Sequence, residues 1–440
     1  MESSSLSSIS WTPTVGQSAL VTVTPAALVH RAWLWDESPD AAVLQKCVDK
    51  LIVRHELLRT RFAVDHSRRI EAITGEPQPV AIHVVDLTHL DREQGLASAR
   101  AVTTDQIRNT VVDVARGPLF WVDLFALSDG SAVLVLIAHH CVCDAWSCAI
   151  FCAELKSLYE SERRSAKARL PRLTREFRDY AAEQNAWLIS EEAKPHIAYW
   201  RNKLATFNKP FWLPADDCAN EECGSRTAVT GEIANPQVLE GLRSLSRQER
   251  CTPFTSVAAA FAATLARWRG LPDAQTWIMH SGRDRPDIKG VIGLFAESWM
   301  LGIDLTTAVT GRDVVRVVWK ASLEARPHMR VTPRVAAGSE SETKRTTFAS
   351  TIFNFLPYRN AEAAPSLKVH PIDIVEKGGH FARNASFAMV FNVMELKSAL
   401  SWSVYYNTGL FRDTTIRGLS DRFAQTLADL AGDPDRPLPQ

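Results

Sequence analysis

The sequence of 440 residues has no net charge and no long apolar run. Lysine and arginine total 50, and aspartate and glutamate also total 50, so no overall field favours a nucleic acid or an anionic membrane. No basic amphipathic arm is present, and the longest apolar runs are far shorter than a membrane span. Met1 is followed by an acid and a serine-rich stretch, without the basic start and apolar core of a signal peptide. We therefore expect a cytoplasmic protein that binds neither nucleic acid nor membrane.

The chain also lacks the cysteine spacing of a zinc site, although four of its eight cysteines crowd one short segment. Without an export signal, a disulfide framework is not expected. Cys148 and Cys152 lie one helical turn apart on or beside an apolar face, where small buried thiols are common. We expect packing thiols and no metal site. The eight cysteines are Cys47, Cys141, Cys143, Cys148, Cys152, Cys218, Cys223 and Cys251.

Strands and helices alternate along a chain that is too long for one core, so we expect two lobes of mixed α/β (α+β) structure. No internal repeat or low-complexity tract is visible. Strands are predicted at 28–35, 82–85, 119–127, 134–138, 276–279, 300–305, 350–355, 387–393 and 400–405. Helices are predicted from about 40, at 146–161, after 253 and at 415–430, with a polar insertion at 338–347.

Two adjacent histidines stand at the end of the most apolar of these strands. The run Ala132–Ala138 is typical of a strand buried on both faces, and His139 and His140 follow it directly. Asp144 comes four residues after His140, where a helical pattern begins at Ala145. A neutral imidazole can take up a proton near neutral pH. The pattern therefore predicts a base held in place, with a carboxylate that fixes the loop around it.

The same residues also have ordinary structural interpretations. A histidine in an apolar setting is more often a hydrogen-bonded core residue than a catalyst, and Asp144 alone would be a helix N-cap. A second motif, Arg54–Phe62, ends the helix that starts near residue 40, where a charged cluster usually forms a solvated cap. Taken alone, the paired histidines leave core packing, metal binding and catalysis open.

Taken together, the two motifs resemble those of the condensation domains of nonribosomal peptide synthetases. That family carries RHExLRTxF near its start and HHxxxDGxS downstream. This chain has Arg54–Phe62 and His139–Ser147, with Ala145 in place of the motif glycine. Weaker matches follow in the family's order, at 177–181, 199–204, 282–286, 292–295, 353–357 and 406–411.

The resemblance is incomplete in three places. The family's opening S-x-A-Q-x-R-L-W has no clear counterpart among residues 11–23, and its V-N-T is replaced by Ala296, Glu297 and Ser298. Its Q-D-x-P-F-E and R-D-x-S-R segments are not legible between about 325 and 350. These regions lie near the substrate tunnel and the bridging elements in the family. The resemblance therefore predicts the reaction better than it predicts the substrates and partners.

The resemblance implies two lobes, each like a chloramphenicol acetyltransferase subunit, in a V-shaped pseudo-dimer with a tunnel between them. We place the lobes at 1–180, with the histidine motif, and at 181–440. Trp146 and Ser147 border the tunnel in the family. Further tunnel residues implied by the matched segments are Gly293, Ser298 and Asn354.

The resemblance also implies transfer of an acyl or aminoacyl group from a phosphopantetheine thioester on a carrier protein to an amine or an alcohol. The enzyme itself binds no cofactor. The resemblance implies a catalytic set of His140, Asp144 and His139. Within it, His140 is the predicted proton acceptor or nucleophile-orienting group, and His139 is predicted to have a structural role. Asp144 shapes the loop, and because an unpaired buried carboxylate is costly, it needs an arginine: by resemblance Arg59, or in second place Arg54.

The replacement of the motif glycine by Ala145 removes the freedom to adopt a positive φ, so the loop must follow a conformation that alanine tolerates. Backbone N–H groups near the start of the helix at Ala145 are candidates to stabilise a tetrahedral oxyanion.

We expect a free-standing, monomeric condensation enzyme that meets an acyl or peptidyl carrier protein in trans and takes a small-molecule or carrier-bound acceptor. An excised domain of a larger synthetase would have the same sequence. Three alternatives stay open. A carrier-independent acyltransferase usually adds a D-F-G-W-G segment, which is not found here, and an epimerisation domain has S-W where this chain has Trp146-Ser147. The third alternative is a non-catalytic recruitment module of the same fold.

Overall fold

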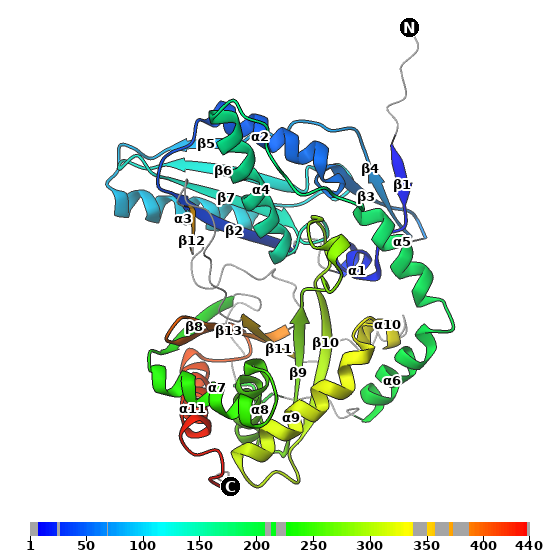
Figure 1. The fold of residues 1–440 in the computed structure, drawn as a ribbon, viewed down its shortest axis with the longest axis vertical. Helices are drawn as coiled ribbons and strands as arrows, with labels where there is room; N and C mark the ends of the chain where they lie inside the picture. Colours follow the sequence, from blue (N-terminus) through cyan, green and yellow to red (C-terminus); the bar gives the residue numbers. More distant parts are fainter. Residues whose placement is uncertain are drawn as a thin grey trace. The chain divides into compact units, whose positions relative to one another are not determined.

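A computed structural model of the chain describes residues 8–23, 27–67, 69–206, 213–216, 226–337, 350–356, 369–372 and 387–437 (Figure 1). The chain divides into two compact units. Unit 1 takes in the described parts of 1–189, the segment 281–296 and the strand at 369–372, and unit 2 takes in the remainder. The lobe boundary that we predicted at residue 180 stays a prediction.

Unit 1 is built on a five-stranded sheet of order β12-β2-β7-β6-β5 and a smaller sheet of order β1-β4-β3. Its strands are β1 (Ile9–Trp11), β2 (Leu28–Trp35), β3 (Thr60–Val64), β4 (Ile70–Thr74), β5 (His83–Asp86), β6 (Phe120–Ala126), β7 (Ala132–His139) and β12 (Val369–Ile372). Its helices are α1 (Val15–Val23), α2 (Ala41–Arg54), α3 (Arg92–Asn109), α4 (Ala145–Arg163) and α5 (Phe177–Leu188), with a 3-10 turn at Glu56–Arg59.

Strand β7 lies at the centre of the five-stranded sheet, and all eight of its residues are buried. It pairs antiparallel with β2 on one side and with β6 on the other. Helix α4 covers one face, where Trp35 meets Tyr159 and Phe120 meets Phe151 with ring centroids 5.5 and 6.3 Å apart. Because all eight residues are buried, both faces of the strand need apolar side chains, which explains its unbroken apolar run. The histidine motif begins at the last residue of this strand.

Unit 2 contains a six-stranded sheet of order β10-β9-β11-β13-β14-β8. Its strands are β8 (Arg226–Ile233), β9 (Asp273–His280), β10 (Glu297–Asp304), β11 (Ser350–Leu356), β13 (Phe387–Glu395) and β14 (Leu400–Asn407). Its helices are α6 (Ala193–Thr206), α7 (Pro236–Gln248), α8 (Pro253–Arg269), α9 (Gly311–Ala325), α10 (Pro333–Ala337) and α11 (Asp413–Gly432).

Helix α8 covers the middle of this second sheet with a cluster of phenylalanine rings. Phe261 stacks on Phe353 of β11 at 4.6 Å, contacts Phe391 of β13 at 5.1 Å and reaches Phe423 of α11 at 6.4 Å. Because these aromatic side chains are large and fully buried, they supply much of the apolar area of this core.

Every strand predicted from the sequence is present within a few residues of its predicted bounds, and the mixed α/β class is confirmed. The predicted insertion at 338–347 lies outside the described residues, as do Cys218 and Cys223. In the described ranges, no helix combines the length and the apolar content that crossing a membrane requires.

Candidate active site

The two histidines leave β7 with their main chain held on both sides. The backbone N–H of His139 donates to the carbonyl oxygen of Leu119 at 2.7 Å, and that of His140 donates to the carbonyl oxygen of Ala27 at 2.8 Å. Leu119 precedes β6 and Ala27 precedes β2, so the strands beside β7 fix the start of the motif loop from both directions.

His139 is fully buried and its ring turns back onto its own loop. Its Nδ1 accepts the backbone N–H of Cys141 at 3.2 Å and lies 2.8 Å from the sulfur of that residue. An Nδ1 that accepts a hydrogen bond leaves the ring proton on Nε2 of a neutral imidazole. These contacts fit the structural role that we predicted for His139, which stays a prediction.

His140 occupies a different environment, although it is the next residue. Its Nδ1 is enclosed and has no hydrogen-bond partner within the described part of the chain. Burial lowers the pKa of His140 below its usual 6.5. The charge of Asp144 and contacts with the backbone of His140 and Cys143 oppose this shift, and the charge of Arg31 adds to it. The ring is therefore neutral at pH 7, which is the form that can accept a proton.

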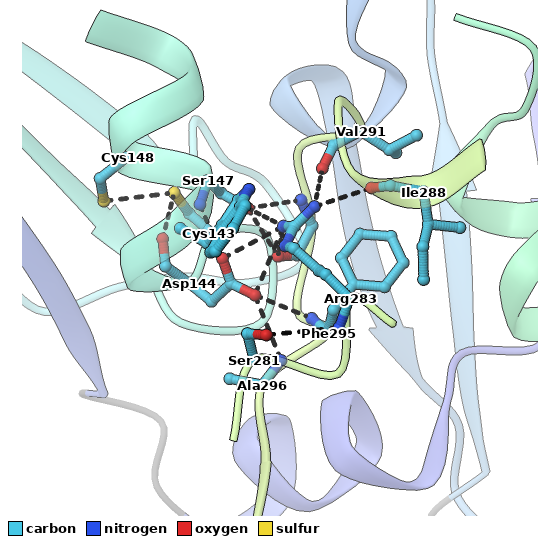
Figure 2. A network of polar contacts seen from close by, with 12 residues as sticks. Cys143, Asp144, Ser147, Cys148, Ser281, Arg283, Ile288, Val291, Phe295 and Ala296 are labelled. Atoms are coloured by element: carbon cyan, nitrogen blue, oxygen red, sulfur yellow. Dashed lines mark hydrogen bonds and ion pairs between the residues drawn. The ribbon is translucent and has the colours of Figure 1, made fainter. Parts of the chain in front are cut away.

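The carboxylate of Asp144 joins the motif loop to the segment 281–296, as Figure 2 shows. Its Oδ1 caps helix α4 by accepting the backbone N–H of Ser147 at 2.7 Å. Its Oδ2 accepts the backbone N–H groups of Phe295 at 3.0 Å and Ala296 at 3.2 Å. A carboxylate engaged in this way anchors a loop and is poorly placed to move protons.

Arg283 pairs with Asp144 through its Nη2, 3.2 Å from Oδ1, and both side chains are buried (Figure 2). Its Nη1 donates to the carbonyl oxygens of Ile288 at 2.9 Å and Val291 at 2.6 Å. The guanidinium also lies over the ring of Phe295, 4.2 Å from the centroid. Burial lowers the pKa of Arg283 and the charge of Asp144 opposes this shift. The ion pair thus closes a buried network around the loop.

The predicted pairing of Asp144 with Arg59, or with Arg54, is wrong. Arg59 donates from Nη1 to the carbonyl oxygen of Gly75 at 2.6 Å, and Nε of Arg54 lies 2.9 Å from Oε2 of Glu154. Because Asp144 caps α4 and Glu154 follows it by ten residues, the backbones of the two residues are about 15 Å apart along the helix axis. An arginine held by Glu154 therefore cannot also reach Asp144.

The motif Arg54–Phe62 instead ties α2 to its neighbouring helices. Nε2 of His55 lies 2.8 Å from Oε2 of Glu154, in the middle of α4. Burial raises the pKa of Glu154, but the hydrogen bonds from His55 and Arg54 outweigh it and hold this pKa below its usual value. Glu56 accepts the backbone N–H of Arg178, at the start of α5, at 2.7 Å. The first motif thus ties α2 to α5 and to α4, whose first turn belongs to the second motif.

Ser147 and Gly293 make a reciprocal contact next to this network. The hydroxyl of Ser147 donates to the carbonyl oxygen of Gly293 at 2.8 Å and accepts its N–H at 3.0 Å, while Nη2 of Arg283 donates to the same hydroxyl at 2.7 Å. A Cβ at position 293 would lie 2.1 Å from a ring carbon of Phe177, so only glycine fits there. Gly293 is buried, and its predicted place in a tunnel stays a prediction.

Ala145 is the first residue of α4, is exposed, and is absent from the residues with positive φ. The turn therefore needs no glycine at this position. The indole N–H of Trp146 donates to the carbonyl oxygen of Lys289 at 3.2 Å. Asn354 and Ser298 belong to unit 2, on β11 and β10, where the side chain of Asn354 donates to that of Asn392 on β13 at 2.8 Å. Their part in a tunnel stays a prediction.

Two residues that hold the site were missed in the sequence. Arg283 lies in the matched segment 282–286, to which we assigned no role. Gln17 donates from its side chain to the carbonyl oxygen of Cys141 at 2.8 Å, inside the motif loop. The signal for Gln17 is a capping box: Thr14 and Gln17 exchange side-chain and backbone hydrogen bonds of 3.1 and 3.2 Å at the start of α1.

The thiols near the motif lie in the core of unit 1. Sγ of Cys143 is 3.5 Å from Sγ of Cys148, and burial raises the pKa of Cys152 to about 12. All cysteines in the described part of the chain are free. Across the same part, no three metal-ligating side chains gather in a group that could hold a metal ion.

Comparison with known proteins places this geometry in a family. A model of the Condensation domain family matches residues 31–440. One of the linear gramicidin synthase subunits of Brevibacillus parabrevis is 28% identical over 404 residues, which cover 91% of this chain and 5% of that protein. The chain thus spans a small fraction of the length of the curated relatives that it matches.

Solved structures of low sequence identity share the fold. The first condensation domain of the calcium-dependent antibiotic synthetase has a TM-score of 0.79 at 20% identity, over 98% of each chain. The X-domain from teicoplanin biosynthesis has a TM-score of 0.81 at 21% identity, over 97% of this chain and 96% of that one. Both the predicted fold and the predicted family are confirmed, and the chain belongs to the condensation domain family.

Proposed function

We propose that this protein condenses an acyl or aminoacyl thioester, carried on the phosphopantetheine of a carrier protein, with an amine or an alcohol. The observation that carries the proposal is the contrast at the end of β7. Around His140 the loop is fixed by hydrogen bonds to Ala27 and Leu119, to helix α1 and to the segment 281–296. In contrast, Nδ1 of His140 has no hydrogen-bond partner among the described residues. A neutral imidazole that a fixed loop holds in place is the expected state of a general base.

In the proposed reaction, the nitrogen or oxygen of the acceptor attacks the thioester carbonyl carbon. A bond forms between the acceptor atom and this carbon, and the proton of the acceptor passes to His140. When the tetrahedral intermediate collapses, the carbon–sulfur bond breaks and the thiolate that leaves takes the proton from His140. A positioned base of this kind contributes about 10²–10⁴-fold to the rate.

The oxyanion of the tetrahedral intermediate needs a donor, and the start of α4 supplies one. The backbone N–H of Ser147 is engaged by Asp144, and that of Cys148 bonds the carbonyl oxygen of Asp144. The backbone N–H of Ala145 has no hydrogen-bond partner among the described residues, and the residue is exposed. We assign this N–H to the oxyanion, where the helix N-terminus also favours negative charge.

The carrier protein is proposed to dock in trans with a monomeric enzyme, and the acceptor to be a small molecule or a second carrier-bound group. The enzyme is proposed to bind no cofactor of its own. Both proposals follow from the resemblance of the two motifs and from membership of the family.

The test is mass spectrometry of acylated carrier proteins incubated with the enzyme and a panel of amines and alcohols. We expect the acyl group to leave the carrier and a new amide or ester to appear, and we expect His140→Ala to abolish this transfer. The matched control is His66→Ala, which removes an exposed histidine of the same unit. Transfer by the His140 variant at the wild-type rate would refute the assignment. Carrier binding without any transfer would favour a recruitment module.

A further inference from the structure

A charged connection between α4 and α5 is the strongest feature of unit 1 that the proposed chemistry does not use (Figure 1). From Arg163 to Arg175 the chain has six cations and no acid, although the whole chain has no net charge. Residues 166–176 form neither helix nor strand. We call residues 163–175 the cationic strap. Its six cations are Arg163, Arg164, Lys167, Arg169, Arg172 and Arg175.

The cationic strap is fastened to unit 1 at both ends and in the middle. Arg163 pairs with Glu37 at 3.0 Å, and Arg175 pairs with Glu183 at 2.7 Å and with Asp287 at 3.0 Å. Between them, Arg54 donates to the carbonyl oxygen of Pro171. The backbone of the strap is therefore held against unit 1 at three places.

The side chains of the strap sort by chemistry. Ala168, Leu170 and Leu173 pack against the hydrophobic core. Lys167, Arg169 and Arg172 are exposed, as is Arg164, and none of these four cations has an ion-pair partner in the part of the chain that the structure describes. The cationic strap therefore packs its apolar side chains against the core and presents unpaired cations to solvent. The counter-charge for these cations must come from another molecule.

The C-terminal end of the cationic strap lies beside the candidate active site. Leu173 is next to Gly290, and Asp287 pairs with Arg175. Lys289, between them, accepts the indole N–H of Trp146 from the histidine motif. The cationic strap and the histidine motif therefore both contact residues 286–290, and all three segments belong to unit 1.

We propose that the cationic strap is the docking surface for an acidic face of the carrier protein; this rests on the proposed function. A lipid surface fits less well, because the apolar side chains of the strap face inward and cannot insert. A single-stranded nucleic acid fits less well, because no aromatic side chain interrupts the cations to stack with bases. A group of exposed charges without exposed apolar side chains favours a partner that is recognised mainly through charge and released readily.

The proposal is tested by the affinity of the full-length enzyme for phosphopantetheinylated carrier proteins, measured by fluorescence anisotropy at about 50 and about 200 mM salt. We expect Arg169→Glu with Arg172→Glu to weaken binding of the best carrier by at least about tenfold at low salt, and to flatten the salt dependence. Arg169→Ala with Arg172→Ala should give a smaller loss of the same sign. Thermal unfolding confirms that each variant is folded.

The matched control is Lys397→Glu with Arg422→Glu, two exposed cations of unit 2 that have no ion-pair partner among the described residues. It should change the affinity less than about twofold. An equal loss in this control, an unchanged affinity in the strap variant, or no measurable binding of any carrier would overturn the proposal. Strap-dependent binding of a 20-nucleotide single-stranded RNA that is tighter than that of every carrier would overturn it in favour of a nucleic acid.

A second readout separates this surface from the chemistry. The rate of transfer from a carrier-bound donor is divided by the rate from a low-molecular-weight pantetheine thioester, which has no protein to dock. We expect this ratio to fall in the strap variant. If the pantetheine donor reacts in the wild type but the ratio stays constant in the variant, the docking surface is wrong and the proposed function stands. If carriers bind through the strap but no donor reacts, the proposed function is wrong and the docking surface stands.

Discussion

Nη2 of Arg283 lies 3.2 Å from Oδ1 of Asp144 and 2.7 Å from Oγ of Ser147, so one buried guanidinium holds both the anchor of the motif loop and the first turn of α4. These two residues are more than a hundred positions away from Arg283 in the chain. The contact fixes the loop that carries His140 against the segment 281–296. The rigidity of the candidate active site therefore depends on a residue outside both sequence motifs.

Replacing Arg283 with glutamine should destabilise the protein by about 3–5 kcal/mol, because it leaves the buried carboxylate of Asp144 without its counter-charge. The free energy of unfolding in urea measures this change. Arg285→Gln is the matched control: that arginine pairs with Glu183 and Asp287 but is 40% exposed, so its loss should cost less than about 1 kcal/mol. Adding Asp144→Asn to Arg283→Gln should restore part of the loss. Fully additive losses would contradict a direct pairing.

Replacing Gly293 with alanine should destabilise the protein by about 1–3 kcal/mol, because the new methyl group would meet the ring of Phe177 at 2.1 Å. Thermal unfolding measures this. Gly418→Ala is the control, since its nearest neighbour is the end of Arg422 at 4.0 Å. Position 418 lies inside α11, so alanine should stabilise that helix by up to about 1 kcal/mol. Equal effects of the two substitutions would show that position 293 is not packed as described.

Replacing Gln17 with leucine should lower stability by about 1–3 kcal/mol, because the buried carbonyl oxygen of Cys141 loses its donor. It should also slow acyl transfer, since that carbonyl lies in the motif loop. Gln45→Leu is the matched control, because its side chain bonds the backbone of Val80 and Ile82 at 3.0 and 2.9 Å, away from the motif. The control should lose stability without a slower transfer at saturating substrate. Equal slowing in both variants would argue against a positioning role for Gln17.

The acid limb of the pH–rate profile should lie below pH 6.5. Burial depresses the pKa of His140, the neutral ring is the active form, and activity is lost only as pH falls through that lowered pKa. Because the charge of Arg31 adds to the depression, Arg31→Gln should move the limb to higher pH. The profile of kcat/KM is measured with an acceptor that does not titrate in this range.

An acid limb above pH 6.5, or a shift to lower pH in the Arg31 variant, would contradict this assignment of His140. The same depression has a consequence for folding. His140 takes up its proton at a higher pH in the unfolded chain than in the folded one. Its titration therefore lowers the free energy of unfolding as pH falls below 6.5 and leaves it unchanged at higher pH.

The sequence predicted the strands well and the polar contacts poorly, for physical reasons. The run Ala132–Ala138 could be placed because a strand buried on both faces needs continuous apolar residues. Helix α3 could not be placed, because its buried side has no large apolar residues at helical spacing. The buried residues are Gly95, Ala99, Thr103 and Thr104. Motif spacing located His140 and Asp144, since neighbouring residues stay neighbours in the fold.

The partner of Asp144 could not be found in the same way. Its arginine comes from a segment distant in the sequence, and only the tertiary structure decides between Arg283, Arg59 and Arg54. The effect of Ala145 was also undecided from the sequence, because a local pattern does not give φ. The structure starts α4 at that residue, and a helical φ suits alanine.

The most direct test of the account is the single-turnover rate of acyl transfer by His140→Gln, compared with the wild type on the same acylated carrier and acceptor. If His140 accepts the proton of the acceptor, and other residues hold its loop in place, the rate should fall by about 10²–10⁴-fold. The thermal stability should stay close to that of the wild type. A rate within a few-fold of the wild type in a folded variant would contradict the role of His140 as general base.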